Sequence, residues 1–180
     1  MKFGGTSVGT PQRMREVVGL ITATNEPTFV VLSAMSGTTN TLVEISDYLY
    51  KKNPEGANNT INKLERKYLE HVDNLYATDA VKEEMNRFIY DEFKYLRSLT
   101  KTHFTSFEEK IILAQGEIIS TNMVTAYLKE SGVKTLLISA LDFMRTDKNA
   151  EPDNHYIREH LVDIMQQNPG YQIYLTQGFI

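Results

Sequence analysis

The sequence of 180 residues contains no cysteine, which excludes both a disulfide framework and a thiolate metal site. It begins without an apolar signal segment and has no run near the roughly 18 apolar residues of a membrane span. Nineteen lysines and arginines face 23 acidic residues, giving a net charge of −4 with no basic run, unlike a nucleic-acid-binding surface. We therefore expect a cytoplasmic protein whose partners include neither nucleic acid nor a membrane.

Histidine is also sparse, and its spacing does not match a set of metal ligands. We expect each of the four on the surface or on a helix face: His71, His103, His155 and His160. The chain is 41% hydrophobic, and at this length about one domain with one sizeable core is expected.

The first residues are the most informative part of what is present. Lys2 leads into the glycine and hydroxyl segment 4–9, and Thr10 with Pro11 is a typical helix start. Strand, glycine turn and helix in this order favour phosphate binding, because glycines let backbone N–H groups approach anionic oxygens and a lysine adds charge. The lysine precedes the glycines, so this is not the nucleotide-binding P-loop. An ordinary turn beside a lysine has the same composition.

The pattern of strand, polar turn and helix then recurs. A helix is expected from 11 to about 24, and the apolar run 28–33 predicts a buried parallel strand. It opens into Ala34-Met35-Ser36-Gly37-Thr38-Thr39-Asn40, followed by a second helix. Two such loops in an open α/β sheet indicate a ligand site at the carboxyl ends of the strands.

The middle of the chain has helical spacing from 60 to 99, which predicts a helical hairpin inserted between α/β units. A long helix follows from about 107 to 129. Gly116 lies inside its apolar series, where glycine costs about 1 kcal/mol relative to alanine, so we expect another group to approach the backbone there. Glu117 stands at the margin of the apolar stripe, which also suits a merely exposed glutamate.

Further elements continue the alternation. Strands are expected at 133–139 and 171–176, with a helix at 153–167 and a polar loop at 144–153 between them. The sequence ends directly after a strand, at a glycine turn of the kind that elsewhere leads into more structure. We expect a piece of a longer protein.

Together these segments resemble the aspartokinase branch of the amino acid kinase family. The resemblance covers essentially the whole chain and rests on four blocks in the family's order: Lys2-Phe3-Gly4-Gly5-Thr6-Ser7-Val8, Val31 to Asn40, Gln115-Gly116-Glu117-Ile118-Ile119-Ser120, and Thr176-Gln177-Gly178-Phe179-Ile180. It implies an α/β fold, a three-layer αβα sandwich with a mostly parallel sheet and a helical hairpin insert at about 53–105.

The reaction that the resemblance implies is transfer of the ATP γ-phosphoryl group to the side-chain carboxylate of L-aspartate. The product, 4-phospho-L-aspartate, leads toward lysine, threonine, methionine and isoleucine. By analogy with the family, Lys2 is the catalytic residue that neutralises phosphate oxygens, with Gly4, Gly5 and Ser7 also binding ATP. Mg²⁺ is expected with the ATP, although no metal ligand can be assigned.

The same analogy places the substrate aspartate on three other residues. Thr39, with Ser33 close by, would hold it, and Glu117 would accept its α-ammonium group. An ionised carboxylate needs no general base, so the task is to bring two anions together and to stabilise the charge on the transferring group.

The resemblance also implies what lies outside residues 1–180. The family's nucleotide-binding half and its C-terminal ACT domains are absent, so we expect this N-terminal portion to be inactive alone and the full-length protein to be a homo-oligomer. Only Met1 precedes the motif lysine, where family members usually carry more apolar residues. A fused homoserine dehydrogenase downstream is compatible with the sequence.

Two other functions stay open. Another amino acid kinase, such as an acetylglutamate or glutamate 5-kinase, would share the fold, although the 37–40 loop and the helical insert argue against that branch. A regulatory or assembly subunit would use the helical hairpin to dock a partner, and changes at Lys2 and Glu117 would then leave catalysis unchanged.

Overall fold

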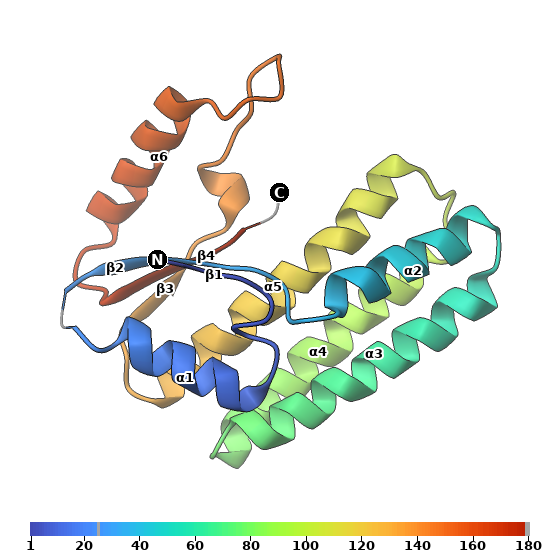
Figure 1. Ribbon diagram of the computed structural model, residues 1–180, viewed down its shortest axis with the longest axis horizontal. Coiled ribbons are helices and arrows are strands. Elements are labelled where there is room, and N and C mark those ends of the chain that lie inside the picture. Colours follow the sequence, from blue (N-terminus) through green and yellow to red (C-terminus); the bar gives the residue numbers. More distant parts are fainter. Residues whose placement is uncertain (25, 179–180) are drawn as a thin grey trace.

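A sheet of four parallel strands forms the centre of the protein (Figure 1). The structure is a computed structural model that describes residues 1–24 and 26–178. The strand order is β1-β2-β4-β3, with register pairs such as Phe3 with Leu32 and Leu32 with Gln177. The strands are β1 (Lys2–Phe3), β2 (Thr28–Leu32), β3 (Thr135–Leu137) and β4 (Ile173–Gln177).

Helices cover both faces of this sheet, which makes three layers (Figure 1). Alternating strand residues divide between the faces, as the period of two requires. Val30, Leu32, Ile173 and Leu175 belong to the larger core, with helices α1 (Pro11–Ile21) and α5 (Ser106–Glu130). Phe29, Leu136 and Tyr174 pack instead with α6 (Asn154–Gln167) and the short 3₁₀ helix η1 (Ala140–Asp142).

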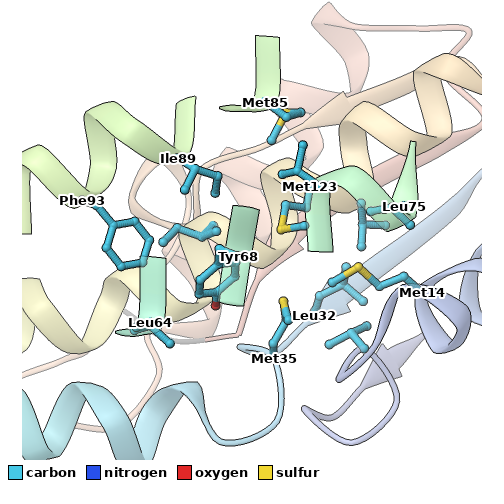
Figure 2. Close-up of a cluster of buried hydrophobic side chains, with 14 of the residues drawn as sticks. Met14, Leu32, Met35, Leu64, Tyr68, Leu75, Met85, Ile89, Phe93 and Met123 are labelled. Atoms are coloured by element: carbon cyan, nitrogen blue, oxygen red, sulfur yellow. The ribbon is translucent and has the colours of Figure 1, made fainter. Parts of the chain in front are cut away.

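Three more helices form a bundle with α5 beside the sheet: α2 (Thr38–Tyr50), α3 (Pro54–Leu75) and α4 (Asp79–Leu99) (Figure 1). Its interior is continuous with the larger core of the sheet. Figure 2 shows fully buried Tyr68 of α3 inside this cluster, near Phe93 of α4 and Met35 of the loop after β2. The bundle is therefore packed against the turn that follows the second strand.

Local signals set where these helices begin. The Thr10 side chain accepts the N–H of Arg13 at 3.2 Å, and Pro11 occupies the first turn of α1. Asn53 caps α3 through the N–H of Gly56, and Thr105 with Glu108 forms a capping box at the start of α5.

The predicted α/β fold with a parallel sheet is confirmed, and every expected helix and strand is present. The differences lie at the ends of elements: α1 ends at Ile21 rather than near 24, and β3 contains three residues of the seven expected. In the described part of the chain, no helix combines the length and the apolar character that crossing a membrane requires.

Candidate active site

Two glycine-containing loops meet at the carboxyl ends of β1 and β2. The N–H of Ser36 donates to the carbonyl oxygen of Gly5 at 3.1 Å. A Cβ added to Gly5 would lie 2.7 Å from the carbonyl oxygen of Ala34, and one on Gly9 would lie 2.9 Å from the Cβ of Ser36. Glycine at 5 and 9 is therefore what allows the two loops to touch.

The first loop leaves one glycine open. Gly4 is exposed, and a Cβ on it would meet nothing within 4 Å. The N–H of Ser7 donates to the Gly4 carbonyl at 2.9 Å, which closes a tight turn, and the Arg13 guanidinium donates to the carbonyl of Thr6 at 2.7 Å. This held turn, with exposed Lys2 just before it, suits an approaching anion.

The second loop turns the chain from β2 into α2. Gly37 has φ +81°, a conformation that strongly favours glycine, and directly precedes the first turn of α2. Thr39 is exposed in that first turn. Ser33 directly follows β2. Its N–H donates a hydrogen bond to the carbonyl oxygen of Phe3 at 3.1 Å, and its own carbonyl oxygen accepts one from the Ser120 hydroxyl at 2.7 Å.

Helix α5 passes close to this second loop. A Cβ on Gly116 would lie 2.8 Å from the Cβ of Ala34 and 3.3 Å from Cγ2 of Thr38, so the expected close approach at Gly116 is confirmed. Glu117 next to it is half-buried. Burial raises the pKa of Glu117, and hydrogen bonding from the backbone of Ala34 offsets part of the rise. A half-buried carboxylate thus lies at the loop, where a cationic group would find its partner.

Two successive residues of α3 bind the second loop from the other side. Nζ of Lys67 donates to the carbonyl oxygen of Ser36 at 3.0 Å. The hydroxyl of Tyr68 hydrogen-bonds to Oγ1 of Thr38 at 2.9 Å in a buried position. Helices α3 and α5 therefore hold the turn that carries Thr39.

The structure brings the candidate residues into two adjoining groups. Lys2, Gly4, Gly5 and Ser7 belong to the first loop and its strand, whereas Ser33, Thr39 and Glu117 surround the second. The geometry is suited to anions through lysine and loop amides, and to an ammonium group through Glu117. Across residues 1–24 and 26–178, no three histidine or acidic side chains gather as a metal site.

Sequence reasoning missed the residues that support these loops. Arg13, Lys67 and Tyr68 lie in helices, where their spacing indicates only a solvated face or a core position. Ser120 lies within the segment 115–120 that resembles the family, but nothing in the sequence indicates that its hydroxyl reaches Ser33 at the end of β2. Phe179 and Ile180, which complete the fourth block, lie outside the described residues.

A parallel α/β sheet with anion-suited loops at the carboxyl ends of its strands is typical of enzymes that handle phosphorylated ligands. The model of the amino acid kinase family matches residues 1–180. The chain belongs to this family.

Its curated relatives include aspartokinases, which confirms the resemblance inferred from the sequence. The chain is 30% identical to an aspartokinase of Chlamydia pneumoniae over 99% of its length, and 24% identical to bifunctional aspartokinase/homoserine dehydrogenase 2 of Escherichia coli. It spans 38% of the first relative and 22% of the second.

Solved structures agree with this. The chain matches E. coli aspartokinase III in complex with aspartate and ADP, with a TM-score of 0.81 and 26% identity, covering 99% of this chain and 40% of that one. Clostridium acetobutylicum aspartate kinase matches in fold, with a TM-score of 0.74 at 16% identity over 38% of its chain. The residues described here thus have the fold of part of an aspartokinase.

Proposed function

We propose that residues 1–180 are the N-terminal portion of the catalytic domain of an aspartokinase, which transfers the γ-phosphoryl group of ATP to the β-carboxylate of L-aspartate. The observation that carries the proposal is the meeting of the two loops, with Glu117 beside the second. Support comes from the aspartokinase relatives and from the likeness to an aspartokinase in complex with aspartate and ADP.

The chemistry divides between the two loops. A carboxylate oxygen of aspartate attacks the γ-phosphorus, the bond from that phosphorus to the β,γ-bridging oxygen breaks, and ADP leaves. Because the nucleophile is already ionised, the protein has to overcome repulsion between anions. Lys2 and the N–H groups around Gly4 and Gly5 stabilise the phosphate charge, with Ser7 hydrogen-bonding nearby.

The second loop orients the amino acid. Thr39 and Ser33 hold aspartate, and the Glu117 carboxylate accepts its α-ammonium group. An ion pair at a half-buried site is worth more than one in water, because the local dielectric is lower. When substrate binds, this ion pair compensates for the free-energy cost of removing water from the Glu117 carboxylate.

The remaining parts of the proposal concern the full-length protein. The first loop fits phosphate oxygens, and ATP would bring Mg²⁺ to shield their charge; residues 1–24 and 26–178 contain no cluster of acidic or histidine side chains that would hold the metal by itself. The nucleotide-binding half belongs to later residues. The enzyme would act in the cytoplasm, as a homo-oligomer, at the first step toward lysine, threonine, methionine and isoleucine.

The test is ATP-dependent hydroxamate formation by the full-length protein with L-aspartate, L-glutamate or N-acetyl-L-glutamate. We expect activity with aspartate that falls at least about a hundredfold in kcat for Lys2→Met, as loss of a transition-state charge contact implies. Exposed Lys63 of α3 provides the matched control, Lys63→Met. Turnover of another amino acid in place of aspartate, or full activity in Lys2→Met, would contradict the proposal.

A further inference from the structure

Helix α3 makes a two-point attachment to the turn between β2 and α2. Lys67 binds the carbonyl of Ser36 and Tyr68 binds the hydroxyl of Thr38, so neighbouring residues on one helix hold the loop on either side of Gly37. A Cβ added to Gly37 would lie 3.9 Å from Nζ of Lys67, which places the ammonium group directly over this glycine. The loop is therefore bound at the residue before Gly37 and at the residue after it.

The loop also has local hydrogen bonds of its own. Backbone hydrogen bonds hold it at Ser36, whose N–H donates to Gly5, and at Thr38, whose N–H donates to Met35 at 3.0 Å. Gly37 itself has a left-handed conformation in the fold. Glycine in an unfolded chain readily adopts many other conformations. The carbonyl oxygen of Gly37 also accepts hydrogen bonds from the N–H of Thr41 at 3.1 Å and from its hydroxyl at 3.0 Å. The side chains from α3 add two attachments from a different helix, at the carbonyl of Ser36 and at the hydroxyl of Thr38.

The hydrogen bond between Tyr68 and Thr38 joins two buried side chains. Tyr68 is fully buried, and burial raises its pKa far above the ordinary value, so the hydroxyl stays protonated at neutral pH. Thr38 is 1% exposed, with its methyl side against Gly116 and its hydroxyl on Tyr68. Without Tyr68 the hydroxyl of Thr38 would be buried without that partner, a state that proteins avoid.

We propose that Lys67 and Tyr68 are positioning residues that hold the Ser36–Thr39 loop in its substrate-binding conformation. Neither side chain touches the reacting atoms; both act through the backbone and side chain of the loop that presents Thr39. The helical hairpin would then be part of the substrate pocket rather than only a packed insert. The catalytic consequence rests on the proposed function, because it assigns Thr39 to the amino acid substrate.

The chain offers a matched control for Tyr68. Tyr76 directly follows α3, is also buried, and donates its hydroxyl hydrogen to the carbonyl of Met123 at 2.8 Å, in the interior of the bundle. Tyr76→Phe and Tyr68→Phe each remove one buried hydroxyl and keep the ring. Only the second removes a bond to the loop. For Lys67, exposed Lys63 one turn earlier gives the control Lys63→Met.

The first measurement is hydrogen exchange at the loop amides, which requires no substrate. In the full-length protein, Lys67→Met and Tyr68→Phe should each speed exchange at Ser36 and Thr38 by roughly fivefold, the factor expected for a lost hydrogen bond of ordinary net strength. Tyr76→Phe and Lys63→Met should leave these two amides unchanged. Unchanged exchange in both loop variants would overturn the proposal, whatever reaction the protein catalyses.

The second measurement is steady-state kinetics with aspartate and ATP. We expect KM for aspartate to rise about five- to tenfold in each loop variant while kcat stays within about twofold, since a displaced loop weakens binding before it alters chemistry. Faster exchange with an unchanged aspartate KM would overturn the link to substrate binding. If the unmodified protein does not use aspartate, the proposed function fails, and the exchange result still decides whether Lys67 and Tyr68 position the loop.

Discussion

Gly116 of α5 lies against Ala34 so closely that a Cβ on Gly116 would be 2.8 Å from the Cβ of Ala34. Thr38 and Leu42 are also near, each 3.3 Å from that position. Only a hydrogen at Gly116 lets α5 approach the end of β2, and this approach brings Glu117 to the second loop. A packing constraint thus sets the place of a candidate binding residue.

The first prediction follows from that contact. Gly116→Ala should destabilise the protein by about 1 kcal/mol, because an overpacking cost of roughly 1–3 kcal/mol exceeds the gain in helix propensity of about 1 kcal/mol. It should also raise KM for aspartate, since Glu117 moves with the helix. Denaturant unfolding and kinetics measure the two effects.

The control for this change is Gly19→Ala in α1. Gly19 is also helical, but it is exposed and a Cβ there would meet nothing within 4 Å. This substitution should therefore raise stability by about 0.5–1 kcal/mol and leave kinetics unchanged. Equal stabilisation by both changes would mean that α5 is not held tightly against Ala34.

The second prediction separates the charge of Glu117 from its packing. Burial raises the pKa of Glu117 above its usual 4.5, so the folded state holds the proton more tightly than the unfolded state. Its contribution to the free energy of unfolding is greatest at low pH and declines as pH rises from about 4.5 through the raised pKa. Glu117→Gln should be at least as stable as the unmodified protein at pH 7 and lose this decline.

The activity of the same variant should fall. Loss of a charged hydrogen-bond partner for the substrate ammonium lowers kcat/KM for aspartate by about tenfold to a hundredfold. Half-buried Glu92 of α4, whose pKa is also raised, by burial and then by Asp91, is the matched control. Glu92→Gln should reproduce the stability profile with normal kinetics; a similar loss of activity in both variants would refute the assigned role.

How far the sequence predicts this structure depends on how local each signal is. Thr10 and Pro11 begin α1, as capping chemistry predicts, because a cap involves only residues three or four apart. The carboxyl-end location of both loops follows from strand order along the chain. The close approach at Gly116 could be predicted as well. Glycine lowers the stability of a helix, so its presence inside an apolar helix indicates a close contact that leaves no room for a side chain.

The supporting contacts could not be predicted in the same way. Lys67 and Tyr68 lie about 30 residues from the loop they bind, and the partner of each depends on how the bundle packs. An aromatic residue at helical spacing indicates a core position, which Tyr68 does occupy. Nothing in that spacing tells where its hydroxyl points.

The third prediction concerns Glu130 at the end of α5, which caps the start of α4. Its carboxylate accepts the N–H and hydroxyl of Thr78, each at 2.8 Å, and the N–H of Ala77. Burial alone would raise the pKa of Glu130, but the hydrogen bonds from Thr78 and Ala77 outweigh it and hold the pKa below 4.5. The carboxylate therefore stabilises the fold above about 4.5, and this contribution is lost as pH falls through the lowered pKa.

Glu130→Ala should cost about 1–2 kcal/mol at pH 7, the usual value of a helix cap with several bonds. The difference from the unmodified protein should shrink in acid. Glu130→Gln, which keeps an acceptor oxygen, should lose less at pH 7. Unfolding curves measured between pH 3 and 8 provide the check, and a difference that does not change with pH would rule out the ionised cap.

The fourth prediction separates packing from ligand binding within the first loop. Gly5→Ala places a Cβ 2.7 Å from the carbonyl oxygen of Ala34, and backbone cannot yield as a flexible side chain can. We expect a loss of about 1–3 kcal/mol in stability, because the two loops must move apart. Gly4→Ala meets no neighbour within 4 Å, and Gly4 does not have a positive φ, so its stability should change by less than about 0.5 kcal/mol.

Nucleotide binding should distinguish the two variants in a different way, because Gly4→Ala should weaken ATP binding although it leaves stability nearly unchanged. A methyl group on exposed Gly4 stands where phosphate oxygens would approach the loop amides, so Gly4→Ala should raise KM for ATP about tenfold while the protein remains fully folded. Thermal unfolding and ATP kinetics on the same samples measure both effects. A stable Gly4→Ala variant with a normal KM for ATP would show that this loop packs against Ala34 and Ser36 without binding the nucleotide, and Lys2 would then need another role.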